Sequence, residues 1–259
     1  MMHAITPSVL CLSGHDPAGG AGVHADIEAV AAQGAHALTV ITALTVQDSH
    51  NVHRVQPVAA ALLAAQLECL MADSRIDAVK LGLIGDAGQL PVIADAIRQL
   101  GVPVICDPVL RAGGGSNLAA AATVAALREQ LFPLIDLLTP NAAEARRLAP
   151  GMADLVEAAA ALAAAGCRQV LVTGGDEPDG DEVRNLWRRL DGDVQTFHWP
   201  RLHAGFHGAG CTLASAIAGR IAVGDDWPRA IEQGQRYTHT ALARAYRSGS
   251  GRLIPRRTT

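Results

Sequence analysis

The chain has 259 residues, of which 49% are hydrophobic and only 3% aromatic, so its interior must be aliphatic and rich in alanine. Its 21 basic and 25 acidic residues give a net charge of −4, which argues against a nucleic-acid-binding surface. The five cysteines are scattered and form no CxxC pair, which argues against a disulfide framework or a structural zinc site. The N-terminus does not resemble a signal peptide, and no apolar run has membrane-spanning length. We therefore expect a cytoplasmic protein that binds neither membrane nor nucleic acid.

Short apolar segments alternate with longer alanine- and leucine-rich segments along the chain. Strands are predicted at residues 8–12, 37–46, 78–83, 102–106, 137–139 and 169–173, and helices at 23–34, 57–71, 90–100, 118–131, 153–165 and 227–246. In residues 182–199, two polar–apolar segments flank Asp191-Gly192-Asp193, which predicts a β-hairpin. The tail, residues 252–259, is expected to be a solvated end. The alternation predicts one doubly wound α/β/α domain over residues 1–259, in three layers around a mostly parallel sheet.

A loop with four glycines, residues 13–22, follows the first predicted strand and precedes a helix. This order is typical of a ligand-binding corner in an α/β protein. Its glycine spacing does not fit GxGxxG, and it is no phosphate P-loop because Lys80 is the only lysine in the chain.

A second small-residue segment, Gly208-Ala209-Gly210, precedes an apolar stripe at helical spacing formed by Leu213, Ile217 and Ile221. Backbone N–H groups at such a helix start favour an anion. The same field is expected to lower the pKa of Cys211 and to favour a thiolate. The alternative is a glycine-lined packing turn with a buried cysteine.

Polar residues follow several of the other predicted strands. Gln47 ends the second strand and Asp107 follows the fourth, while Asn141 and Glu144 form a capping pattern after the fifth. In a parallel sheet these positions share one edge, so we expect Asp107 and Glu144 to hold Mg²⁺ there, directly or through water. Taken singly, Gln47 could lie in a solvated turn, and Asp107 could be a turn former.

Two glycine loops, carboxylates and a group at a helix start suit phosphoryl transfer, which depends on alignment and charge neutralisation. Residues 208–211 would hold the migrating phosphate, the N-terminal loop and Gln47 the acceptor, and Cys211 would take the proton or align the acceptor. Two other classes stay open: a thiol hydrolase or transferase using Cys211 and His207, and a non-catalytic small-molecule sensor.

The motifs together resemble those of bacterial hydroxymethylpyrimidine/phosphomethylpyrimidine kinases of the ribokinase-like superfamily. The resemblance spans nearly the whole chain and is carried by residues 13–22, 25–26, 42–43, 47, 80–82, 107–109, 139–141, 144, 174–175 and 207–212. It implies ATP-dependent phosphorylation of 4-amino-5-hydroxymethyl-2-methylpyrimidine and then of its monophosphate, in thiamine synthesis. It also implies Mg²⁺ as a cofactor and a homodimer.

The resemblance also implies roles for individual residues. The pyrimidine would contact Gly14, Asp26, Gln47, Leu83 and Val109. The anion hole would be Gly208, Ala209 and Gly210, with Cys211 as the acid–base group. ATP would contact Asn141, Thr173, Gly175 and Arg111.

Basic residues that are frequent in relatives are absent at Gly113 and in residues 173–176, and Gly205-Phe206 replaces the usual Asn-Thr. Arg111 is a candidate substitute in the phosphate clamp. Related pyridoxal-phosphorylating enzymes share the cysteine, so a pyridoxal or pyridoxine kinase is the alternative activity.

Overall fold

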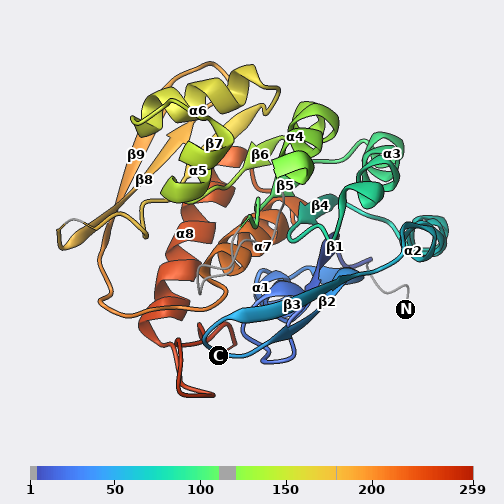
Figure 1. The fold of residues 1–259 in the computed structure, drawn as a ribbon, viewed down its shortest axis with the longest axis horizontal. Helices are drawn as coiled ribbons and strands as arrows, with labels where there is room; N and C mark the ends of the chain where they lie inside the picture. The colour runs from blue at the N-terminus through green and yellow to red at the C-terminus, as the bar shows by residue number, and fades with distance from the viewer. Residues whose placement is uncertain (1–4, 111–120, 179, 259) are drawn as a thin grey trace.

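One nine-stranded sheet in the order β3-β2-β1-β4-β5-β6-β7-β8-β9 organises the computed structural model, which describes residues 5–110, 121–178 and 180–258 (Figure 1). Strands β2, β1, β4, β5, β6 and β7 run parallel, and β3, β8 and β9 pair antiparallel. The strands are β1 Ser8–His15, β2 His36–Gln47, β3 Val52–Pro57, β4 Ala78–Leu81, β5 Val104–Cys106, β6 Leu137–Leu138, β7 Gln169–Val172, β8 Glu182–Arg188 and β9 Val194–Pro200.

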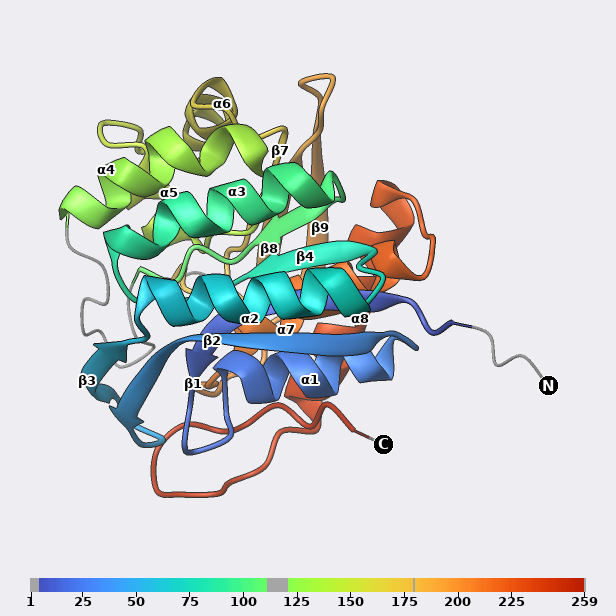
Figure 2. The same cartoon turned by 90° about the vertical axis from the view of Figure 1, so that its right-hand side faces the viewer.

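Helices cover both faces of this sheet, which confirms the predicted three-layer α/β fold. Helices α1, α7 and α8 lie on one face, and α2 to α6 lie on the other (Figures 1 and 2). The helices are α1 Gly22–Ala32, α2 Ala60–Asp73, α3 Leu90–Leu100, α4 Ala121–Gln130, α5 Ala142–Leu148, α6 Leu155–Ala164, α7 Ala209–Ala222 and α8 Trp227–Ala243. Two 3₁₀ turns, Ala87–Gln89 and Phe132–Leu134, complete the described elements.

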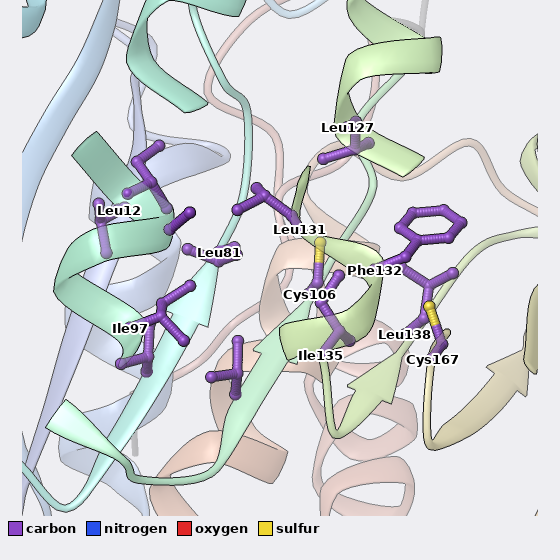
Figure 3. Close-up of a cluster of buried hydrophobic side chains, with 14 of the residues drawn as sticks. Leu12, Leu81, Ile97, Cys106, Leu127, Leu131, Phe132, Ile135, Leu138 and Cys167 are labelled. Carbon is purple, nitrogen blue, oxygen red and sulfur yellow. The ribbon is translucent and has the colours of Figure 1, made fainter. Parts of the chain in front are cut away.

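The apolar run of β1 shows why the strands are buried on both faces. Leu10 and Leu12 pack into the core under α2–α6, whereas Val9 and Cys11 pack into the core under α1, α7 and α8. Alternate residues of a strand point to opposite faces, so a continuous apolar run serves both cores. Figure 3 shows the first core, where Leu12, Leu81, Cys106 and Leu138 of successive strands face side chains from the helical layer.

The predicted hairpin is confirmed as β8 and β9, whereas β3 was not predicted. Its sequence, Val-His-Arg-Val-Gln-Pro, is short and polar, as suits the edge strand of a sheet. Strand β2 is apolar in sequence, but Leu44 is 50% and Val46 is 56% exposed, because this end of β2 lies near the edge formed by β3.

The prediction of a solvated C-terminal tail is wrong. Ile254 is 1% and Arg257 only 3% exposed. Leu253 forms a β-bridge with Phe206, and Ile254 forms one with Tyr246. The tail therefore packs against the segment that leads into α7.

Among the described residues, no helix is long and apolar enough to cross a bilayer.

Candidate active site

A cavity of about 760 Å³ lies at the carboxyl ends of the parallel strands, the edge that the loop pattern predicts. Its volume is within the usual range for small-molecule sites. The residues assigned from the sequence that line it are Gly14, Gln47, Leu83, Asp107, Val109, Asn141, Glu144, Thr173, Gly175, Gly208, Ala209, Gly210 and Cys211. Asp26 does not line it, and Arg111 lies outside the described residues.

The start of α7 forms one wall of the cavity and is built to receive an anion. Gly208 is the N-cap residue with φ +85°, and no side chain caps the helix. A Cβ at Gly208 would lie 2.0 Å from the carbonyl oxygen of Gly20, so only glycine permits this close approach of the two glycine loops. The uncapped N–H groups of the first turn and the helix dipole favour negative charge at this end of the cavity.

Cys211, in the first turn of α7, is a thiol rather than the thiolate that we expected. Burial raises its pKa to about 12, although the Lys80 ammonium opposes this effect. The neighbouring thiol in turn lowers the pKa of Asp107, although burial outweighs this effect. The prediction of a lowered pKa is wrong because desolvation, together with the nearby carboxylates Asp107 and Asp26, outweighs the favourable charges.

Beneath the cavity, Lys80 and Asp26 form a fully buried ion pair. Lys80 Nζ lies 2.7 Å from Asp26 Oδ1 and 2.9 Å from Ser13 Oγ, and both charged side chains are 0% exposed. Ser215 Oγ donates to the same Asp26 oxygen at 2.6 Å. Burial is the largest single influence on the pKa of Lys80 and would lower it, but the Asp26 carboxylate together with Cys211 and Asp107 outweighs burial and raises the pKa. Lys80 therefore places a fixed positive charge under Cys211 and Asp107.

His207 binds Asp16 across the two glycine loops. Its Nε2 lies 2.7 Å from Asp16 Oδ2, which also accepts hydrogen bonds from the N–H groups of Gly20 and Ala21. Burial would raise the pKa of Asp16, but the hydrogen bond from His207 and those from the backbone lower it. The histidine is thus engaged with Asp16 in joining the loops, an arrangement that does not support a cysteine–histidine nucleophile pair.

Asp107 and Glu144 face the cavity as a pair of buried carboxylates. Burial is the main cause that raises the pKa of Asp107, and burial together with Asp107 raises the pKa of Glu144 to about 8. Glu144 also accepts hydrogen bonds at 3.2 Å from the N–H groups of Leu110 and Asn141, the latter as part of the predicted capping box. The two carboxylates repel each other when both are charged, and a hard divalent cation between them would stabilise both charged forms. Their oxygen atoms are the kind of ligand that such a cation prefers. No cluster of three or more His, Cys, Asp or Glu side chains that could hold a metal ion is found among the described residues.

The opposite end of the cavity is lined by β8, β9 and α8. Trp199 stacks on His239 with ring centroids 5.4 Å apart, and its Nε1 donates to Gln235 Oε1 at 3.1 Å.

Asp176, which also lines the cavity, accepts hydrogen bonds from the backbone N–H groups of Ala142 and Ala143 at the start of α5. Asp176 therefore has a structural partner, and this end offers an aromatic, hydrogen-bonding surface.

Sequence reasoning did not assign a role to several residues that shape the site. A role for Lys80 could have been predicted, because it is the only lysine in the sequence and lies within an apolar strand, which is buried in the structure. The pairing of His207 with Asp16, 191 positions apart, carried no sequence signal of its own, nor did the contact of Arg257 with Gly20, 237 positions apart.

The sequence is similar to that of a known family of kinases. The family model described as phosphomethylpyrimidine kinase matches residues 16–255. The hydroxymethylpyrimidine/phosphomethylpyrimidine kinase of Rhizobium meliloti is 36% identical, with 96% of both chains covered. That of Escherichia coli is 34% identical, with 92% of this chain and 91% of the other covered.

Solved structures place the chain in the ribokinase-like fold. The Bacillus subtilis pyridoxal kinase in complex with ADP superposes with a TM-score of 0.89 at 25% identity, with 97% of each chain covered. The phosphomethylpyrimidine kinase of Clostridium difficile gives a TM-score of 0.77 at 26% identity, covering 89% of this chain and 97% of the other. With the family model and the sequence relatives, these matches establish that the chain belongs to the phosphomethylpyrimidine kinase family.

Proposed function

We propose that this protein transfers the γ-phosphoryl group of ATP to 4-amino-5-hydroxymethyl-2-methylpyrimidine and then to the resulting monophosphate. The observation that carries the proposal is one cavity that joins the anion-binding start of α7 to Gln47 and to Asp107. A member of this kinase family needs these three parts for phosphate, acceptor and charge neutralisation, respectively.

The acceptor would lie at the end of the cavity formed by β1, β2, β4 and β5. Gly14 allows close packing there, since a Cβ on it would lie 2.9 Å from Leu83 Cδ2. Leu83 and Val109 supply apolar contacts for the ring, and Gln47 supplies polar groups for its nitrogen substituents. Asp26 would act from beneath, by fixing Lys80, because its side chain is fully buried.

The γ-phosphate would lie against residues 208–210, where N–H groups can stabilise its charge. The acceptor oxygen attacks phosphorus, the bond to ADP breaks, and the hydroxyl proton leaves by way of Cys211. Because Cys211 is itself protonated, it relays that proton by passing its own to Asp107. The Lys80 ammonium, which lies beneath Cys211 and Asp107, stabilises the negative charge that develops near the reacting atoms.

Mg²⁺ would be held by Glu144, and by Asp107 through a bound water so that the Asp107 carboxylate can still receive the proton. The ion would supply neutralisation of the phosphate charge. ATP would extend toward Asn141, Thr173 and Gly175. The contribution of Arg111 stays a prediction, as do the homodimer, the cytoplasmic location and the single domain over residues 1–259.

The test is ADP release with ATP, Mg²⁺ and the pyrimidine, in parallel with pyridoxal. We expect turnover on the pyrimidine, and a Gln47→Ala variant is expected to raise its KM while the KM for ATP stays within about twofold. Folded wild-type protein without turnover on either acceptor would refute the kinase assignment and favour a sensor. Unchanged pyrimidine KM in Gln47→Ala would place the acceptor elsewhere.

Pyridoxal kinase is a second candidate activity, favoured by the TM-score of 0.89 with the Bacillus subtilis enzyme. The sequence relatives favour the pyrimidine, since the 36% and 34% identical proteins carry that name. A higher kcat/KM for pyridoxal than for the pyrimidine would reverse this preference.

A further inference from the structure

The C-terminal tail carries an arginine to the rim of the cavity. Backbone hydrogen bonds fix its position: Arg252 N–H donates to Ser49 O at 3.0 Å, and Leu253 N–H donates to Gly205 O at 2.9 Å. Ser49 lies two residues after Gln47, and Gly205 lies three residues before the N-cap of α7. Arg252 therefore stands between the acceptor end of the cavity and the segment that leads into the anion loop.

The side chain of Arg252 lines the cavity and runs along Gly205, where an added Cβ would lie 3.6 Å from Arg252 Cγ. Its guanidinium forms no hydrogen bond or ion pair with the part of the chain that the structure describes. Arg201, which lines the same cavity, instead donates to the carbonyl oxygens of Gly175, Gly180 and Glu182. Partial burial lowers the pKa of Arg252, as expected for a cation that has lost water without gaining an anion.

The cavity otherwise carries an excess of negative charge. The described residues that line it include the acidic side chains Asp16, Asp48, Asp107, Glu144 and Asp176, and the two guanidinium groups of Arg201 and Arg252. Even with Glu144 neutral, as its pKa of about 8 implies, the acidic groups outnumber the guanidinium groups. A neutral hydroxymethyl acceptor enters such a site without a charge penalty. A phosphate monoester, which is close to doubly charged at neutral pH, is repelled unless a cation receives it.

We propose that Arg252 binds the phosphate group of the monophosphate acceptor and so makes the second phosphorylation possible. This inference rests on the proposed function. The N–H groups at residues 208–210 are needed for the migrating phosphoryl group, and Lys80 is committed to Asp26. The planar guanidinium of Arg252 offers paired donors that match phosphate oxygens.

Other side chains anchor the tail, so a substitution at Arg252 is expected to remove its charge without displacing the tail. Arg257 donates to Gly20 O, to Thr212 Oγ1 at 2.8 Å and to Glu28 Oε2 at 3.1 Å. Tyr237 Oη donates to Arg257 O at 2.8 Å. Removal of the Arg252 charge is therefore expected to leave the tail docked.

The experiment compares the wild type, Arg252→Gln and Arg252→Lys with the pyrimidine and with its purified monophosphate as separate acceptors. We expect Arg252→Gln to lower kcat/KM for the monophosphate about 10- to 100-fold, with values for the pyrimidine within about twofold. Arg252→Lys is expected to restore part of the loss. The control Arg256→Gln removes an exposed tail arginine that lies over the Tyr246 ring, and is expected to act as wild type with both acceptors.

Equal losses with both acceptors would overturn the proposal, since they would mean a structural role. A raised KM for ATP in both steps would assign Arg252 to the nucleotide phosphates instead, and an unchanged monophosphate reaction would leave it no phosphate role. Calorimetric titration of the monophosphate without ATP separates this inference from the proposed function. Weaker binding to Arg252→Gln than to wild type supports the anion site even if turnover fails, and equal binding refutes it.

Discussion

Replacement of Lys80 by methionine tests whether the buried ion pair is the central electrostatic element of the site. The change would leave the Asp26 carboxylate in a fully buried position with Ser215 as its remaining side-chain donor. Asp26 Oδ2 already has no hydrogen-bond partner, so nothing nearby replaces the lost ammonium. Leaving one charge of a buried pair without its partner costs about 3–5 kcal/mol. At about 2 °C per kcal/mol for a domain of this size, the midpoint of thermal unfolding is expected to fall by about 6–10 °C.

The assay is urea denaturation at pH 7 together with thermal unfolding, for Lys80→Met and for Lys80→Met combined with Asp26→Leu. The double variant removes both charges and is expected to regain most of the lost stability, because a buried ion pair and apolar residues of similar size are often equivalent. Its turnover is expected to stay low, because the positive charge beneath Cys211 and Asp107 is still missing. A loss below about 1 kcal/mol in the single variant, or a double variant no more stable than the single one, would refute this reasoning.

Three further predictions follow from the glycine loops and the thiol. Gly208→Ala, at φ +85° and with a Cβ 2.0 Å from Gly20 O, is expected to lose most ATP turnover and about 2 kcal/mol or more of stability in urea titrations, whereas Gly224→Ala, at φ +99° with open space, carries the backbone strain alone. Cys211→Ala is expected to keep its unfolding midpoint within a few degrees and to lose about 100-fold in kcat, since the proton relay is gone. Asp16→Asn is expected to lower the free energy of unfolding at pH 7, measured by urea titration. Because the pKa of Asp16 is lowered in the folded protein, its carboxylate stabilises the fold above the ordinary pKa of 3.8, and this stabilisation disappears as the pH falls through the lowered pKa. The variant and the wild type are therefore expected to converge in acid.

Each of these predictions has an outcome that contradicts it. Equal effects of the two glycine substitutions would show that contact with Gly20 is unimportant. Near-normal kcat in Cys211→Ala would remove the thiol from the mechanism. A stability difference for Asp16→Asn that persists unchanged at pH 2 would mean that the hydrogen bonds to Asp16 do not depend on its charge.

The order of elements and the location of the site followed from local patterns. The short apolar runs of β1 and β4 predicted strands, and the alternating segments around Asp191-Gly192-Asp193 predicted the β8–β9 hairpin. Once a parallel sheet is inferred, its connectivity brings the loops after successive strands to one edge. Gly14, Gln47, Asp107 and Gly208, which are far apart in the chain, were therefore expected in one cavity, and they line one.

The charge states and the long-range contacts depended on the tertiary structure. A helix start beside Cys211 predicts a thiolate, but burial and the nearby carboxylates raise its pKa to about 12. The polar tail predicts a solvated end, yet Arg257 is buried against Gly20 and Thr212. Periodicity and glycine spacing reflect constraints within a few residues, and the sequence carries these directly. Desolvation and the pairing of distant side chains depend on what packs around each group, which is fixed only when the sheet and its two helical layers assemble.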